Sequence, residues 1–147
     1  MQPAKHNYTV LQQICQHIPA HLVAKLSRDY GVDKQARGFS PWSHVVAMLH
    51  VHLAHSLSLN DVADTLRNHS GVLTTIRRAT PPSRNGLSHA NRVRDPDMAQ
   101  ALFWEVLSHI QSQHPDFGRG HKYSGLPKRF KRAIHAIDST TIQLVAN

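Results

Sequence analysis

Apolar residues in the first three quarters of the chain recur at the three- and four-residue spacing of α-helices. An early helix is predicted around Leu22, Val23 and Leu26. Pro19 is suited to its first turn and Gly31 to its C-terminal end. A longer helix is predicted to begin at residues 40–41. Its apolar stripe must pack on something, and it consists of Trp42, Val45, Val46, Leu49, Leu53 and Leu57.

Two short capped helices follow. Ser58 begins the sequence SLND, which resembles a capping box, and Gly71 is expected to end the helix behind it. Its buried face is predicted to consist of Leu59, Val62, Ala63 and Leu66. After a short segment at residues 72–78 and a break at residues 81–82, Ser83 can cap a helix that runs to about Arg94.

A last helix is predicted between the Asp-Pro pair at residues 95–96 and Pro115. Its buried side is expected to consist of Met98, Leu102, Val106 and Ile110. The pattern then changes to the alternation of a β-hairpin, with one strand up to Ile137, a turn at residues 138–139 and a second β-branched strand. The predicted fold is mainly α: a helical DNA-binding domain at 1–115, a basic linker at 116–132, and two strands at 133–147.

Charge favours a polyanionic partner for this chain. The 147 residues carry 17 Lys and Arg against 9 Asp and Glu, a net charge of +8. Two segments, between Asp64 and Asp95 and between Asp116 and Asp138, hold six basic residues each and no acid. The sequence contains neither a secretory signal nor a membrane span. The one cysteine, Cys15, is expected to be a buried small hydrophobe. These features favour the cytoplasm.

The helix from Arg84 carries the candidate DNA-reading face. Arg84, Ser88, Asn91 and Arg92 share one side of it, while Leu87, Ala90 and Val93 can face the core. Arginine can bind guanine and asparagine can bind adenine through two hydrogen bonds each. An ordinary solvated helix surface is the alternative, and Gly86 weakens the helix prediction. Further candidate DNA contacts are Arg77, Arg78, Lys128, Arg129, Lys131 and Arg132.

The chain holds 13 histidines, of which His52 and His55 have helical spacing and His44 falls near the same face. A zinc site would need further ligands, commonly Cys or a carboxylate, and residues 39–60 contain neither. A polar helix face with neutral imidazoles is therefore the preferred interpretation. Asp138, at the end of an apolar strand and before small hydroxyl residues, has the placement of a Mg²⁺ ligand, although such an aspartate is more commonly a turn residue.

Nearly the whole chain resembles the N-terminal part of DDE transposases of bacterial insertion sequences, of the IS-four kind. The resemblance rests on five strings: YG from Tyr30, RGFSPW from Arg37, SLNDV from Ser58, SRNGLSHANRVRD from Ser83 and AIDSTTI from Ala136. The last string is similar to the first catalytic strand of the family's RNase H-like core. Asp138 matches the first of three carboxylates that hold two Mg²⁺ ions for cleavage and joining of DNA.

The resemblance implies that the helical region binds double-stranded DNA at the element's terminal inverted repeats, in the bacterial cytoplasm beside the nucleoid. The second aspartate and the glutamate are not among the 147 residues. The hairpin is accordingly interpreted as the truncated start of the RNase H-like core, and the chain alone is expected to be inactive as an enzyme. Self-association, or association with the full-length transposase, is the expected protein contact.

Two other functions fit parts of the pattern. A small helix-turn-helix regulator that dimerises through its C-terminal hairpin would bind a palindromic target as a stable dimer. A phosphatase of the haloacid-dehalogenase kind is suggested by the Asp138 motif but fits poorly, since Thr140 stands where that motif has a second aspartate. That motif also normally opens a chain rather than closing it.

Overall fold

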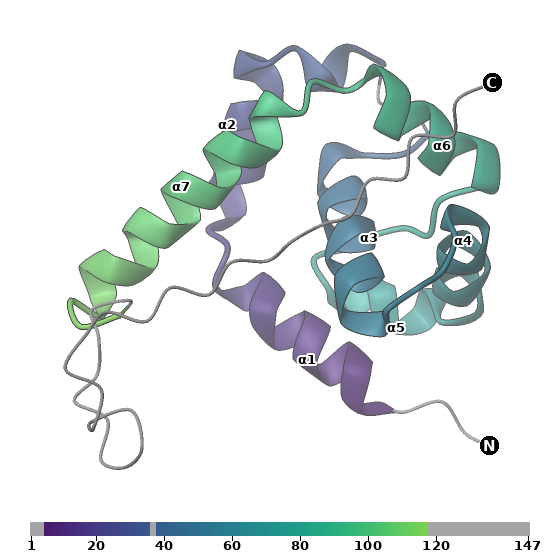
Figure 1. The fold of residues 1–147 in the computed structure, drawn as a ribbon, viewed down its shortest axis with the longest axis horizontal. Helices are drawn as coiled ribbons and strands as arrows, with labels where there is room; N and C mark the ends of the chain where they lie inside the picture. The colour runs from purple at the N-terminus through teal and green to yellow at the C-terminus, as the bar shows by residue number, and fades with distance from the viewer. Residues whose placement is uncertain (1–4, 36–37, 118–147) are drawn as a thin grey trace, which may run out of the picture.

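The computed structural model describes residues 5–35 and 38–117, which form seven α-helices and one short 3₁₀ helix (Figure 1). No strand occurs in these two ranges, so the mainly α prediction is confirmed for this part of the chain. The expected strands at 133–147 and all but the first two residues of the expected linker lie outside it. The elements are α1 Lys5–Gln16, α2 Ala20–Asp29, η1 Val32–Gln35, α3 Pro41–Ala54, α4 Leu59–Asn68, α5 Ser70–Thr75, α6 Arg84–Val93 and α7 Asp97–Gln113.

Three serines fix where helices begin, as the sequence predicts. The side chains of Ser40, Ser58 and Ser83 each accept a hydrogen bond from the backbone N–H three residues later, at 3.0, 3.1 and 2.9 Å. Each bond satisfies one of the amides that a helix leaves without a partner in its first turn. The starts of α3, α4 and α6 are therefore set by local chemistry.

The larger of two hydrophobic clusters lies among α1, α3, α4, α5 and α6. Its fully buried side chains include Leu11 and Cys15 of α1, Val62 and Leu66 of α4, and Leu87 of α6. The burial expected for Cys15 is confirmed, and desolvation raises the pKa of its thiol to about 11. This cluster holds α6 against α4 and thereby orients the outer face of α6.

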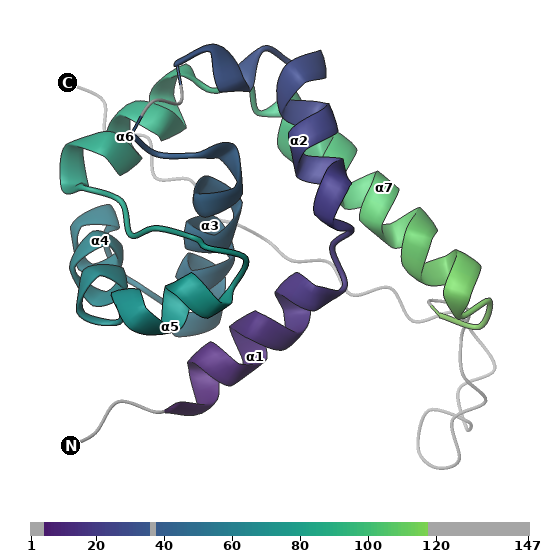
Figure 2. The same ribbon diagram turned by 180° about the vertical axis from the view of Figure 1, so that it is seen from behind.

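The second cluster joins α2, η1 and α7. Met98 and Leu102 of α7 are buried against Leu22, Val23 and Leu26 of α2. The two helices lie side by side in both views (Figures 1 and 2). The long helix α7 therefore packs along the side of the molecule formed by α2.

Several details differ from the sequence prediction. Helix α3 ends at Ala54 because His55 adopts a left-handed conformation with φ 49°, and Leu57 beyond it is 98% exposed rather than part of the stripe. Helix α4 ends at Asn68, and Gly71 lies inside α5 instead of ending α4. Val93 is 46% exposed and does not face the core. Among the described residues, no helix is long and apolar enough to cross a membrane.

Candidate nucleic-acid interface

Helix α6 presents a polar face because its apolar residues are committed to the core. Leu87 and Ala90 are buried, as predicted, while Ser88, Asn91 and Arg92 are exposed. Gly86 lies in the first turn, where a Cβ atom would come within 2.8 Å of the Ser83 hydroxyl oxygen. The glycine that weakened the helix prediction therefore makes room for the capping side chain.

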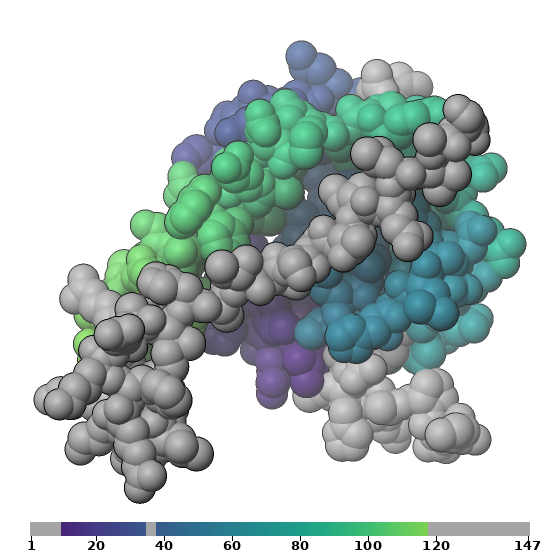
Figure 3. Space-filling model, in the orientation of Figure 1, coloured from purple at the N-terminus to yellow at the C-terminus, as the bar shows by residue number. Residues whose placement is uncertain are grey.

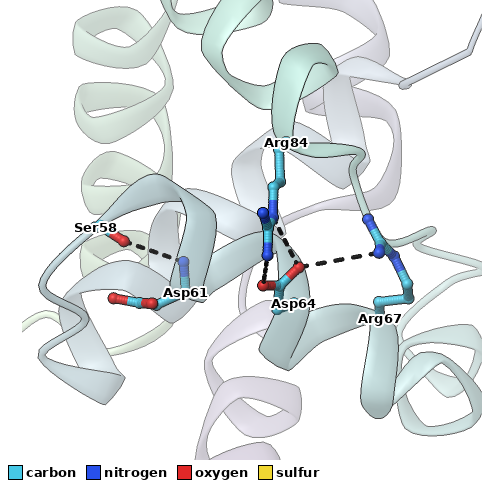
Figure 4. Close-up of polar contacts among 5 residues, drawn as sticks. All are labelled: Ser58, Asp61, Asp64, Arg67 and Arg84. Carbon is cyan, nitrogen blue, oxygen red and sulfur yellow. Dashed lines mark hydrogen bonds and ion pairs between the residues drawn. The ribbon is translucent and has the colours of Figure 1, made fainter.

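Arg84, the first residue of α6, forms an ion pair with Asp64 of α4 (Figure 4). Its Nε donates to Asp64 Oδ1 at 3.1 Å, and its Nη2 donates to Asp64 Oδ2. The hydrogen bond from Arg84 lowers the pKa of the Asp64 carboxyl, and the same contact raises the pKa of Arg84. Arg67 of α4 approaches the same carboxylate at 3.9 Å. Arg84 is thus exposed but already holds a carboxylate in the geometry that it would offer to guanine.

Asn91 is also engaged within the protein. Its Oδ1 lies 2.6 Å from Nε2 of His44 on α3. Burial is the main cause that lowers the pKa of His44, so its ring is neutral at pH 7 and its Nε2–H donates to the amide oxygen. The amide nitrogen of Asn91 keeps its two N–H donors, and a base edge or a phosphate could accept from them.

Arg92 and Ser88 are the residues of this face with the fewest side-chain contacts within the described part of the protein. Arg92 is exposed, and within the described residues its one hydrogen-bond partner is His89, with Nη2 to Nδ1 at 3.5 Å. Ser88 is exposed and has no side-chain hydrogen bond in residues 38–117. Ser88 can therefore reach a ligand without breaking an internal contact, and Arg92 would give up only its long contact with His89.

Arg77 and Arg78 behave differently although they are neighbours. Arg77 Nη2 donates to the carbonyl oxygens of Cys15 and Ile18, at 2.6 and 2.5 Å, and its guanidinium lies 4.7 Å from the centroid of the Trp42 ring. These contacts satisfy carbonyls at the C-terminal end of α1. Arg78 is exposed and makes no such contact within the described part of the chain. Both residues have positive φ, 47° and 57°.

Arg94 was not among the candidate contacts, and the structure gives it a structural place. Its guanidinium donates to the carbonyl oxygens of Phe39 and Ser40 and lies 5.4 Å from the Phe39 ring centroid. Burial lowers its pKa. Arg94 thus ties the end of α6 to the start of α3. Arg67, which sequence reasoning also left out, joins the Asp64–Arg84 pair at the rim of the candidate face.

The connection between α4 and α6 differs from that of a simple helix-turn-helix. Helix α4 ends at Asn68 and α6 begins at Arg84, with α5 and the segment 76–83 between them. A helix-turn-helix joins its two helices by three or four residues. Since α4 nevertheless packs directly on α6, the pair shares one outer rim at Asp64 and Arg84.

The remaining candidates, Lys128, Arg129, Lys131, Arg132 and Asp138, lie outside the described residues. Within the described ranges, no three His, Cys, Asp or Glu side chains are grouped so that they could hold a metal ion. The fit of a magnesium ion to Asp138 therefore stays a prediction.

The site and fold define a small helical domain with one partly basic, polar helix face. Residues 6–76 match the model of a family described as a domain of unknown function, DUF4372. That match runs from the start of α1 to the end of α5 and stops before α6. Searches of curated proteins and of solved structures found no match to this chain.

Proposed function

We propose that this chain binds double-stranded DNA through the exposed face of α6, as the DNA-binding N-terminal part of an insertion-sequence transposase of the IS-four kind. The observation that carries the proposal is the outer side of α6, where Ser88, Asn91 and Arg92 are exposed and no acid occurs between Arg84 and Arg94. The net charge of +8 supports the choice of a polyanion.

The contacts of α6 suggest a distinct role for each side chain. Ser88 is available to phosphates or base edges without rearrangement, and Arg92 is available once its long contact with His89 is released. Asn91 offers amide donors while His44 holds its oxygen. Arg84 must exchange the Asp64 carboxylate for a phosphate or a guanine edge, so its contribution to DNA affinity is reduced by the cost of breaking that pair.

The resemblance to transposases extends the proposal to the terminal inverted repeats of the element as the target. It also assigns Asp138 to the first of three Mg²⁺-binding carboxylates. The other two are not in the 147 residues, and one carboxylate does not hold two divalent ions against water. We therefore expect a polypeptide of these 147 residues alone to leave DNA intact in the presence of Mg²⁺. Nicking that disappears in Asp138→Ala would contradict this part of the proposal.

Fluorescence anisotropy with a labelled duplex tests the DNA-binding proposal. If about six phosphates are neutralised, the logarithm of the affinity should fall against the logarithm of salt concentration with a slope of roughly −5. A flat response would contradict binding to a polyanion.

Arg92→Ala tests whether α6 is the reading face, with Lys25→Ala as its matched control. Lys25 is an exposed cation on α2, so its loss changes the net charge equally. If Arg92 reads a base, Arg92→Ala should cost about 1–3 kcal/mol of binding free energy on the preferred sequence, and Lys25→Ala much less. Equal losses for the two variants would place recognition elsewhere.

Substitutions of the remaining candidate DNA-binding residues are expected to change DNA binding in two different ways. Arg84→Ala and Asn91→Ala should relax the sequence preference, because they remove donors to base edges. Substitutions at Lys128, Arg129, Lys131 or Arg132 should weaken binding to all sequences alike, because such cations contact phosphates. A loss of sequence preference on changing these four residues would reverse the assignment.

A further inference from the structure

Helix α7 has a second apolar stripe that its packing against α2 covers only in part. Met98 and Leu102 face α2, and Ala99, Phe103, Val106 and Ile110 follow one another at spacings of four, three and four residues on the adjacent side of the helix, where Val106 also packs against the α2 cluster. This is the spacing of the contact positions in paired helices, where side chains of one helix insert between those of another. Phe103 is 59% exposed, and Trp104 beside it 58%.

The stripe forms one wall of an open apolar groove. The groove has a volume of about 1110 Å³, and α3 forms its opposite wall with Val45 and Leu49 among the lining residues. Figure 3 shows α7, in green, as a ridge along one edge of the molecule. The groove thus has the lining of a site for a helix with an apolar stripe of its own.

The charge of α7 indicates that the helix bound in this groove is α7 of a second copy. The 17 residues of α7 contain two acids, Asp97 and Glu105, and no Lys or Arg, although the chain carries +8 overall. Two copies of this basic chain would repel each other at most of their surfaces, but not where their α7 helices meet. Asp95 lines one end of the groove and His114 the other, so an antiparallel neighbour would bring its His114 to Asp95, and the reverse.

We propose that α7 is a self-association surface: two copies of this chain pair their α7 helices antiparallel, each in the groove of the other. Such a contact uses the same patch on both copies, as a two-fold symmetric dimer requires. The aromatic ring of Phe103 would be buried at its centre. The proposal does not rest on DNA binding, although Ala90 and Asn91 of α6 also line the groove, so a partner helix there would lie beside the candidate DNA-reading face.

Sedimentation equilibrium of the full chain over a concentration series tests this dimer, with Phe103→Glu as the disrupting variant. Phe103 is exposed enough that a charge there should leave the monomer folded, and far-UV circular dichroism checks that it does. Ser108→Glu is the matched control, because Ser108 is exposed on the opposite side of the same helix. The unsubstituted chain and Ser108→Glu should reach the mass of two 16.5 kDa chains, and Phe103→Glu should remain at one.

Three results would overturn the proposal. An unsubstituted chain that stays at one-chain mass at its highest concentration would show that another segment or another protein covers the groove. A dimer that persists in Phe103→Glu would use a different surface. Loss of the dimer in Ser108→Glu as well as Phe103→Glu would show that the effect is not specific to the stripe.

A separate pair of variants tests the antiparallel orientation of the two α7 helices. His114→Asp should weaken the dimer, because it places two carboxylates at each end of the groove, and adding Asp95→Asn should restore it in part. Asparagine can still accept the hydrogen bond that the Asp97 N–H donates to Asp95 at 2.9 Å. No change in dimer strength on His114→Asp would contradict the antiparallel arrangement.

Discussion

Arg77→Ala is expected to lower the stability of the domain rather than to remove a DNA contact. The sequence suggests a cation free for phosphate, but the structure shows a guanidinium that donates to two carbonyls at the end of α1 and stacks on Trp42. The Trp42 Nε1–H in turn donates to the Ile76 carbonyl at 3.0 Å. Arg77 therefore links α1, α3 and the end of α5.

The magnitude follows from these contacts. A hydrogen bond from a charged donor contributes about 1.5–3 kcal/mol, and one Nη2 shared between two carbonyls at a solvent-accessible residue contributes as a single bond near the lower value. The cation–π contact adds about 0.5–1 kcal/mol. The sum of about 2–3 kcal/mol is a large part of the roughly 5–15 kcal/mol that stabilises a typical domain.

Urea unfolding followed by circular dichroism measures this loss, and Arg78→Ala is the control. Arg78 has the same left-handed backbone and is exposed, so its truncation should change stability by less than about 0.5 kcal/mol. Arg77→Gly should lose less than Arg77→Ala, because glycine recovers roughly 1 kcal/mol of backbone strain at positive φ. Unchanged stability in Arg77→Ala together with weaker DNA binding would refute the structural role.

Three other perturbations have defined outcomes. Asp64→Asn should free Arg84 and raise DNA affinity. Since the pKa of Asp64 is lowered, the Asp64–Arg84 ion pair should stabilise the fold above pH about 4. That stabilisation should be lost on acidification below that pH, as acid unfolding would show. Gly86→Ala should fail to gain the usual ~1 kcal/mol of helix propensity, because the added Cβ displaces the Ser83 cap, and a gain of that size in urea would contradict the steric argument. Burial holds the pKa of His44 below its ordinary 6.5, so stability should be complete above that pH and decrease as the pH falls below it. Melting temperatures of His44→Gln should depend less on pH over that interval, and an equal dependence would exclude His44 as a cause.

Local signals made most of the fold predictable. Each of the three serine caps satisfies backbone amides within its own first turn, so neighbouring sequence suffices to place the starts of α3, α4 and α6. Periodic apolar residues likewise identified Val62 and Leu66 as buried. The C-terminal ends of helices were harder to predict, because His55 ends α3 through a backbone conformation that a histidine rarely adopts.

The candidate site was predictable in position but not in its contacts. The polar residues of α6 follow from spacing, and Leu87 and Ala90 do turn inward. The partners of these residues come from distant segments: Asp64 lies 20 residues before Arg84, and His44 lies 47 residues before Asn91. Sequence spacing along one helix contains no information about such pairs. It therefore could not separate Arg77, held by α1, from Arg78.

The most direct test of the central claim is a titration of isotope-labelled protein with a DNA duplex, followed by NMR of backbone amides and arginine side chains. We predict that the largest shifts occur at Ser88, Asn91 and Arg92, that the Arg84 guanidinium signal moves as it leaves Asp64, and that α2 changes little. Shifts concentrated on α2 or α7, with α6 unchanged at saturating DNA, would contradict the assignment of α6 as the DNA-binding face.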